Sequence, residues 1–171
     1  LRSSSPLLLL IEDDTELRKF LRASLPSKHR IPEAANGAEG TQMALELVPD
    51  LVITDWVMPQ KDGLEVTESL KKNPSTSHIP LILLTAKSSV ESKLQGLSRG
   101  ADAYLTKPFR ADELVAHIES LLASRQRLQA FFAKDAQDKT VVESAVAALP
   151  PEENEFLQRL IHVVEENLDN E

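Results

Sequence analysis

The 171-residue sequence contains no cysteine. A disulfide framework, a thiolate metal site and a thiol nucleophile are therefore excluded, and a reducing compartment is compatible with the chain. Long apolar runs are also missing, because segments such as Leu7–Ile11 are far shorter than the roughly 20 residues that a membrane-spanning helix needs. We expect no membrane insertion and a cytoplasmic location.

The chain also lacks an excess of basic residues. It has 19 Lys+Arg against 27 Asp+Glu, a net charge of -8. Residues 1–134 contain 17 basic and 17 acidic side chains, so the whole excess lies in residues 135–171. Because an acidic segment repels the phosphate backbone, we expect no direct contact of this chain with nucleic acid.

Apolar strand-like segments alternate along the chain with segments of helical periodicity. Strands are predicted at 7–11, 30–35, 51–54, 79–84 and 101–105, and helices at 15–25, 38–48, around 64–70, at 88–98 and from 111 onward. The first helix is predicted to be capped by Asp14 and to carry its apolar residues at Leu17, Phe20, Leu21 and Leu25. This alternation predicts an α/β fold with a doubly wound, five-stranded parallel sheet.

Polar residues follow the predicted strands where ligands bind in such sheets, beyond the carboxyl ends. Glu12 and Asp13 follow the first strand and Asp55 follows the third. Three converging carboxylates repel one another unless a cation joins them, and an all-oxygen set favours Mg²⁺. Thr85 and Lys107 end the last two strands and can bind phosphoryl oxygens, which makes Asp55 the candidate nucleophile for phosphoryl transfer.

These motifs resemble the receiver domain of two-component response regulators. The matching segments, in order, are Ile11-Glu12-Asp13-Asp14, Ile53-Thr-Asp-Trp-Val-Met-Pro59 with Gly63, Leu84-Thr85-Ala86 and Tyr104-Leu-Thr-Lys-Pro-Phe109. The resemblance covers about residues 6–124 and implies a flavodoxin-like receiver fold. It further implies that Asp55 takes a phosphoryl group from a phosphohistidine of a histidine kinase, and that the domain is a switch rather than an enzyme.

The same resemblance implies roles for other residues. Glu12, Asp13, Asp55 and the backbone carbonyl of Val57 would bind Mg²⁺, and Thr85 and Lys107 would contact the phosphoryl group. Tyr104 would be the switch aromatic that turns inward as Thr85 moves, and the Lys107–Pro108 peptide would be cis.

Two other classes stay open at this stage. Haloacid-dehalogenase-type phosphatases also use an Asp nucleophile, but they usually carry a second Asp two residues later, where this chain has Val57. Val57 cannot orient an attacking water through its side chain, which also favours slow self-dephosphorylation. A receiver-like domain that only binds partners is disfavoured by the intact Asp13, Asp55, Thr85 and Lys107.

The remaining segments suggest a piece of a larger regulator. Residues 1–5 are interpreted as a remnant, and 125–171 as a helical extension or linker toward an output domain. Residues 154–168 resemble the helix before an AraC-type DNA-binding domain, an arrangement found in hybrid sensor kinases. The helix from 111 is predicted to end before a polar break at 133–140, and 141–149 and 152–168 to form further helices.

A seam of six residues at spacings of 4, 3, 4, 3 and 4 follows the helix that begins at 111: Leu114, Ile118, Leu121, Arg125, Leu128 and Phe132. The seam favours a homodimer through this helix or through the C-terminal one, and packing of Phe131 and Phe132 against the same chain is the alternative. Trp56 is interpreted as an exposed loop aromatic or part of a docking surface. The histidines at 29, 78, 117 and 162 are interpreted as surface or boundary residues.

Overall fold

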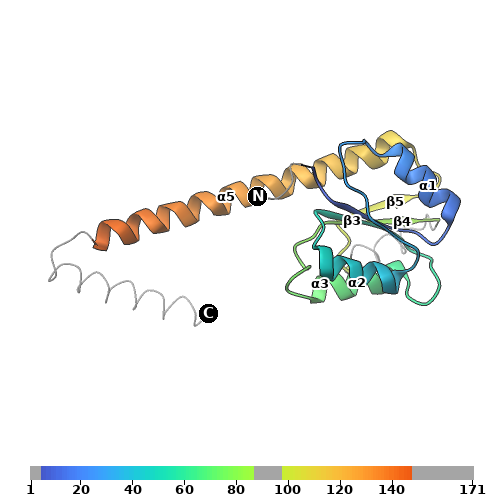
Figure 1. Ribbon diagram of the computed structural model, residues 1–171, viewed down its shortest axis with the longest axis horizontal. Helices are drawn as coiled ribbons and strands as arrows, with labels where there is room; N and C mark the ends of the chain where they lie inside the picture. Colours follow the sequence, from blue (N-terminus) through green and yellow to red (C-terminus); the bar gives the residue numbers. More distant parts are fainter. Residues whose placement is uncertain (1–4, 87–97, 148–171) are drawn as a thin grey trace. The chain divides into compact units, whose positions relative to one another are not determined.

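A computed structural model describes residues 5–86 and 98–147, with side chains described up to residue 130 (Figure 1). The strands are β1 (Leu8–Ile11), β2 (Glu33–Ala34), β3 (Leu51–Asp55), β4 (Leu81–Thr85) and β5 (Ala103–Thr106). The helices are α1 (Thr15–Ser24), α2 (Gly37–Leu47), α3 (Gly63–Lys72) and α5 (Ala111–Ala147). The helix predicted at 88–98 lies almost wholly outside the described residues, and the one at 152–168 lies entirely outside them.

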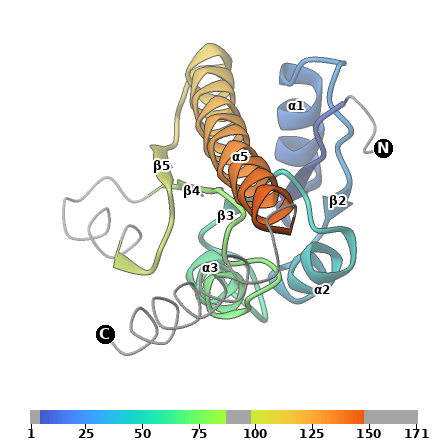
Figure 2. The same cartoon turned by 90° about the vertical axis from the view of Figure 1, so that its left-hand side faces the viewer.

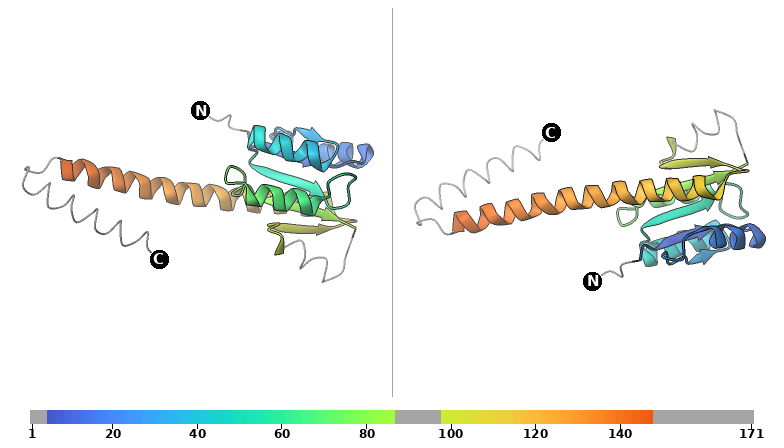
Figure 3. Two further views of the ribbon diagram at one scale, coloured as in Figure 1. Left: turned by 90° about the horizontal axis from the view of Figure 1, so that it is seen from below. Right: turned by 90° about the horizontal axis from the view of Figure 1, so that it is seen from above.

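The strands form one sheet in the order β2-β1-β3-β4-β5, and every pair is parallel. Helices α2 and α3 cover one face, while α1 and the first turns of α5 cover the other (Figures 2 and 3). Because both faces are covered, β1, β3 and β4 are buried along their whole length, which explains their uninterrupted apolar runs. The predicted α/β fold is confirmed.

Local sequence signals set most helix starts. The side chains of Asp14 and Asn36 accept hydrogen bonds from the first turns of α1 and α2, and Asp62 forms a capping box with Glu65 at α3. The Lys107–Pro108 peptide is cis, as the resemblance implied. The second strand is shorter than predicted because Pro32 has no N–H to donate, so that only Glu33 and Ala34 pair in regular register.

The predicted break at 133–140 is wrong, because α5 continues without interruption to Ala147. The segment is polar but contains neither glycine nor proline, and Ala, Lys and Gln are good helix formers. The chain divides into two compact units, residues 1–125 and residues 126–171. No helix within the described parts of the chain contains a stretch that is apolar and long enough to span a bilayer.

The seam predicted along α5 mostly faces the sheet of its own domain. Leu114 and Ile118 are buried in the core and Leu121 packs against it. Arg125 Nη1 donates to the carbonyl of Asp50 at 2.7 Å and to that of Pro49 at 3.2 Å. Arg125 is therefore wrongly assigned to an intermolecular seam. Leu128 is exposed, and Phe131 and Phe132 lie outside the residues whose side chains are described.

The interpretations of two single side chains, Trp56 and His29, are also wrong. Trp56 is only 3% exposed, so it belongs to the core and not to a docking surface. His29 is buried, whereas His78 is exposed and His117 half-buried as expected; His162 lies outside the described residues. Phe20 is 53% exposed although it shares the helical spacing of the buried Leu21, because α1 contacts the sheet along a narrower stripe than the sequence pattern suggests.

Candidate functional site

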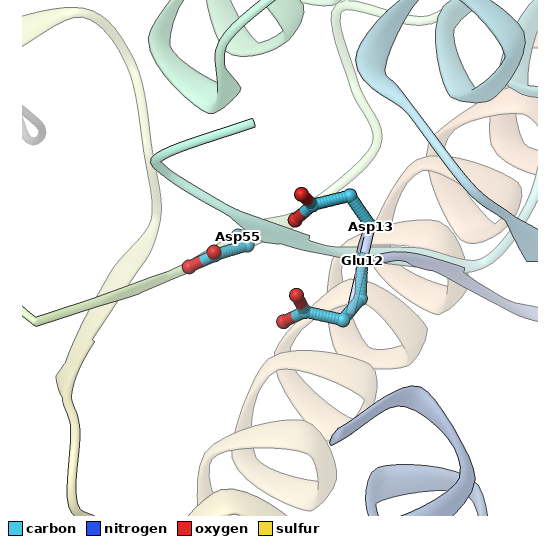
Figure 4. A group of neighbouring side chains, drawn as sticks. All are labelled: Glu12, Asp13 and Asp55. Carbon is cyan, nitrogen blue, oxygen red and sulfur yellow. The ribbon is translucent and has the colours of Figure 1, made fainter. Parts of the chain in front are cut away.

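Three carboxylates meet at the carboxyl ends of the central strands. Glu12 and Asp13 directly follow β1, and Asp55 is the last residue of the neighbouring β3. Each of the three offers a carboxylate oxygen, and these oxygens lie within 4.8 Å of one another. Figure 4 shows the carboxyl groups of Glu12 and Asp13 on either side of the β1 end, turned toward the side where Asp55 lies. We call these three residues the acidic cluster.

Lys107 brings a positive charge to the acidic cluster from the end of β5. Its Nζ lies 2.9 Å from Asp55 Oδ1 and 3.2 Å from Glu12 Oε2. The backbone helps to place it, since Lys107 N donates to the Thr85 carbonyl at 2.6 Å just before the cis peptide. One ammonium group is therefore shared by two carboxylates.

Burial shifts the ionisation of the cluster. Burial raises the pKa of Glu12, and the charge of Asp55 adds to this against the opposing effect of Lys107. Burial likewise raises the pKa of Asp55, while the hydrogen bond from Lys107 opposes the rise. For Lys107, burial alone would lower the pKa, but Asp55 and Glu12 outweigh it and raise the pKa. The carboxylates are thus incompletely neutralised, a state that a divalent cation relieves.

The residues predicted to act with Asp55 lie on the same edge of the sheet. Thr85 is fully buried and ends β4; it follows Leu84, the register partner of Asp55 on β3, and pairs with Thr106 on β5. Val57 lies in the loop after β3 and is 60% exposed. Asp14 acts as the cap of α1, as predicted.

Gly63 explains how α3 approaches the acceptor strand. Its N–H donates to the Trp56 carbonyl at 2.8 Å. A Cβ at this position would lie 2.1 Å from the carbonyl oxygen of Asp55, a separation that no side chain tolerates. The glycine quoted in the sequence motif therefore permits the backbone of the α3 N-terminus to pack against the end of β3.

Tyr104 and Trp56 form an aromatic pair behind the acidic cluster. Both side chains are buried, and their rings meet edge to face with centroids 6.1 Å apart and an interplanar angle of 82°. The ring predicted to move inward is thus inside in this conformation. Both residues belong to the motifs quoted from the sequence, but no sequence pattern predicted that their rings are in contact.

Two features of the site were not predicted. An apolar groove of about 510 Å³ lies between α1 and the loop that follows β5, lined by Leu17, Phe20, Lys107, Pro108 and Phe109. The side chain of Arg18 reaches from α1 to the backbone of Glu12. Phe20 could have indicated the groove, because it falls on the apolar spacing of α1. No sequence pattern predicted the contact of Arg18 with the Glu12 backbone.

Comparison with known proteins identifies the domain. Residues 8–119 match the response regulator receiver domain family. Histidine kinase P4 of Formosa agariphila is 36% identical over 164 residues, which are 96% of this chain and 12% of that protein. The DNA-binding dual master transcriptional regulator RpaA of Synechocystis is 35% identical over 72% of this chain and 52% of its own length.

Solved structures agree. A response regulator of Chloroflexus aurantiacus has a TM-score of 0.67 and 31% identity over 70% of this chain and 99% of its own. The receiver domain of sensor histidine kinase PA1611 from Pseudomonas aeruginosa, which holds a magnesium ion in its active-site cleft, has a TM-score of 0.65 and 26% identity over 70% and 99%. The chain spans about half or less of the length of the curated relatives named above. With a matching family, sheet order and site, this chain belongs to the response regulator receiver domain family of two-component signalling.

Proposed function

We propose that Asp55 is the phosphoacceptor of this receiver domain and that its donor is a phosphohistidine of a histidine kinase. A carboxylate oxygen of Asp55 attacks phosphorus, the P–N bond breaks, and the imidazole leaves with the electron pair. The observation that carries the proposal is the meeting of Asp55 with Glu12, Asp13 and Lys107 at one edge of a parallel sheet. These groups supply the nucleophile and the charges that phosphoryl transfer requires.

The acidic cluster would hold Mg²⁺, with the Val57 carbonyl as a fourth protein ligand. The donors in the cluster are all carboxylate oxygens, which suits a hard divalent cation. When bound, the cation neutralises charge on the phosphoryl oxygens and on the cluster. The chain's own contribution is to hold Glu12, Asp13 and Asp55 together, although burial, and then the charge of Asp55, raise the pKa of Glu12.

Lys107 and Thr85 would bind the phosphoryl oxygens after transfer. Lys107 Nζ already contacts Asp55, so a phosphoryl group on that carboxylate falls within reach of the ammonium group. Thr85 ends the neighbouring strand β4, one residue beyond the register partner of Asp55, and offers a hydroxyl donor. Tyr104 would respond to movement of Thr85 by changing its packing against Trp56.

The apolar groove beside Lys107 would seat the helix of the kinase that carries the phosphohistidine. Phe20 stands exposed on its rim, and Phe109 packs partly against the core beneath it. Because Lys107 lines the groove and also contacts Asp55, a helix bound there brings its histidine next to the acceptor.

The chain would be part of a longer regulator. We propose that residues 6–124 form the receiver, 1–5 a remnant, and 125–171 a link toward an AraC-type output domain in a cytoplasmic or membrane-anchored hybrid kinase. The similarity to Histidine kinase P4, which runs through 96% of this chain, supports a kinase origin for the extension. Self-association through α5 would begin beyond Arg125, at the exposed Leu128, or would use the helix that the sequence predicts at 152–168.

The test is phosphoryl uptake. The protein is incubated with acetyl phosphate or a phosphorylated kinase domain, with and without Mg²⁺, and its mass is measured. We expect one added phosphoryl group that requires Mg²⁺, complete loss in Asp55→Asn and no loss in Asp62→Asn, since Asn at that position can still cap α3.

Uptake that persists in Asp55→Asn would refute the acceptor assignment. Absence of any Mg²⁺-dependent uptake in the parent protein would instead support a domain that only binds partners. Repeated turnover of a phosphomonoester would support the phosphatase class. The apolar, exposed Val57 argues against turnover and predicts a slowly hydrolysed acyl phosphate.

A further inference from the structure

Arg18 links α1 to the backbone at the acidic cluster. Its Nη1 donates to the carbonyl oxygen of Glu12 at 2.5 Å, and its Nε lies 3.3 Å from Glu33 Oε2. The side chain is only 16% exposed. The guanidinium is therefore held at two points, on the chain that leaves β1 and on the edge strand β2.

A hydrogen bond to the Glu12 carbonyl can affect the geometry of the acidic cluster. Regular pairing of β1 with β3 ends at Ile11 and Thr54, and the Glu12 N–H donates to the Ala34 carbonyl at 3.1 Å. The Glu12 carbonyl belongs to the planar peptide that joins Glu12 to Asp13. The direction of that peptide sets where both side chains leave the backbone, so Arg18 fixes two of the three members of the acidic cluster through one hydrogen bond.

We propose that Arg18 is a positioning residue for the divalent cation bound by the acidic cluster, a role that rests on the proposed function of that cluster in binding Mg²⁺. Arg18 orients the Glu12–Asp13 peptide so that both carboxylates converge on Asp55. It acts through the backbone, and its carboxylate partner is Glu33, outside the cluster. Two donors of the planar guanidinium are needed at once, one for each anchor.

Arg22 provides a matched control one turn further along α1. Its Nη1 donates to Glu33 Oε1 at 2.9 Å and to the Ile31 carbonyl at 2.6 Å. Arg22 thus shares the helix, the residue type and the Glu33 partner of Arg18, but its backbone bond goes to the chain before β2. Loss of Arg22 removes a comparable set of contacts and leaves the Glu12 carbonyl bonded.

The experiment measures Mg²⁺ affinity in the whole chain by calorimetry and by emission of Trp56, which directly follows Asp55. Arg18→Ala is expected to weaken Mg²⁺ binding about tenfold, the lower end of the effect seen for groups that orient metal ligands. Arg22→Ala is expected to stay within about twofold of the parent. Arg18→Lys, which can donate to the carbonyl but cannot form the fork, is expected to fall between the parent and Arg18→Ala.

A second readout separates positioning from general damage. The rate of Asp55 phosphorylation by acetyl phosphate should be reduced in Arg18→Ala at low Mg²⁺ and should return to the parent value at saturating Mg²⁺. Urea unfolding without Mg²⁺ reports the stability of each variant. If Arg18→Ala does not fold, Glu33→Gln removes the charge that anchors Arg18 and should weaken Mg²⁺ binding more than Arg22→Ala does.

Equal Mg²⁺ affinity in the parent and a folded Arg18→Ala, or equal losses in Arg18→Ala and Arg22→Ala, would overturn the inference while leaving the acceptor role of Asp55 intact. If Arg18→Ala does not fold, Mg²⁺ affinity in Glu33→Gln no weaker than in Arg22→Ala overturns it equally. A parent protein that binds no Mg²⁺ would overturn this inference and the metal assignment together, and absence of phosphoryl uptake despite Mg²⁺ binding would overturn the acceptor assignment alone.

Discussion

Acidic residues at the amino ends of the strands, which we call the amino edge of the sheet, are paired differently from those at the carboxyl ends, the carboxyl edge. Asp50 and Asp102 lie at the amino ends of β3 and β5, each directly before its strand. Asp102 Oδ2 accepts from the Leu81 amide at 2.9 Å and from Lys71 Nζ at 2.8 Å. Asp50 Oδ2 accepts from the Leu7 amide at 2.9 Å, and its Oδ1 lies 3.5 Å from Arg125 Nη1. Each acid there has its own amide and its own cation.

At the carboxyl ends of the strands, the acids outnumber the cations among the residues that the structure describes. Glu12 and Asp55 share Lys107, and Asp13 lies within the same cluster. Burial raises the pKa of both Glu12 and Asp55 despite the lysine. The comparison indicates that acids before the strands hold the fold together, whereas acids after the strands cost stability and are kept for binding a cation and a phosphoryl group.

The largest effect that tests this comparison is expected for Asp102→Ala. The substitution leaves the Leu81 amide and the Lys71 ammonium without their shared acceptor, and an unsatisfied buried donor costs about 1–3 kcal/mol. We expect the free energy of unfolding in urea to fall by about 2 kcal/mol. Glu16→Ala on the exposed surface of α1 is the control and should change it by less than about 0.5 kcal/mol. An equally small loss in Asp102→Ala would show that the amino edge does not carry the stability assigned to it.

Asp55→Asn is expected to act in the opposite direction. Because the pKa of Asp55 is raised from 3.8 by burial, the folded state binds the proton more tightly than the unfolded state. The parent therefore loses stability as the pH rises from about 3.8 through the folded pKa, and the neutral Asn lacks that loss. Without Mg²⁺ at pH 7 we expect Asp55→Asn to be more stable than the parent by about 1 kcal/mol.

The pH and metal dependence check the cause of this gain. The difference between Asp55→Asn and the parent should shrink as the pH falls toward 3.8, and Mg²⁺ should stabilise the parent more than the variant. Chemical unfolding at several pH values, with and without Mg²⁺, measures both. A variant less stable than the parent at pH 7 without Mg²⁺ would show that Lys107 already neutralises the cluster.

The sequence was sufficient for the parts of the molecule governed by local rules. Buried strands appear in the sequence as apolar runs because both sheet faces are covered, and Asp14 caps α1 through a short-range hydrogen bond, as predicted. Asn36 and Asp62 cap α2 and α3 by the same local rule, although neither cap was predicted. The polar residues after the strands had to meet, because parallel strands end on one edge. The acidic cluster follows from topology once the five strands are predicted.

Contacts between distant segments could not be predicted in this way. Trp56 directly follows Asp55 in the sequence, yet its side chain packs against Tyr104 of β5. The path of the chain after β3 depends on the close packing of Gly63, at the start of α3, against the backbone of Asp55. Arg125 has the spacing of an apolar seam, but two carbonyls at the amino edge of the sheet accept its hydrogen bonds. Such contacts depend on three-dimensional proximity, which periodicity within one helix does not encode.

The smallest effect on stability is expected for His29, which belongs to neither group of acids. It is buried in the turn between α1 and β2, and neither ring nitrogen has a hydrogen-bond partner. Burial lowers its pKa from 6.5, Lys28 lowers it further, and Glu119 on α5, which pairs with Lys28, opposes the shift. The His29 imidazole lies away from the acidic cluster, so we expect it to affect the stability of the fold but not the binding of Mg²⁺ or the uptake of a phosphoryl group.

The sign of this effect is fixed by the direction of the shift. Since the folded pKa is below 6.5, the unfolded chain takes up a proton first as the pH falls, and stability present above pH 6.5 is lost below it. For one proton the slope cannot exceed about 1.4 kcal/mol per pH unit. His29→Phe removes the titrating group and should flatten the stability profile below pH 6.5, with Mg²⁺ affinity and phosphoryl uptake unchanged. Urea unfolding across that range measures the slope, with His78→Phe at an exposed position as the control. A profile that keeps its slope in His29→Phe would assign the acid sensitivity to other groups, and a loss of phosphoryl uptake would show that an unsatisfied buried side chain outside the acidic cluster can also serve the site.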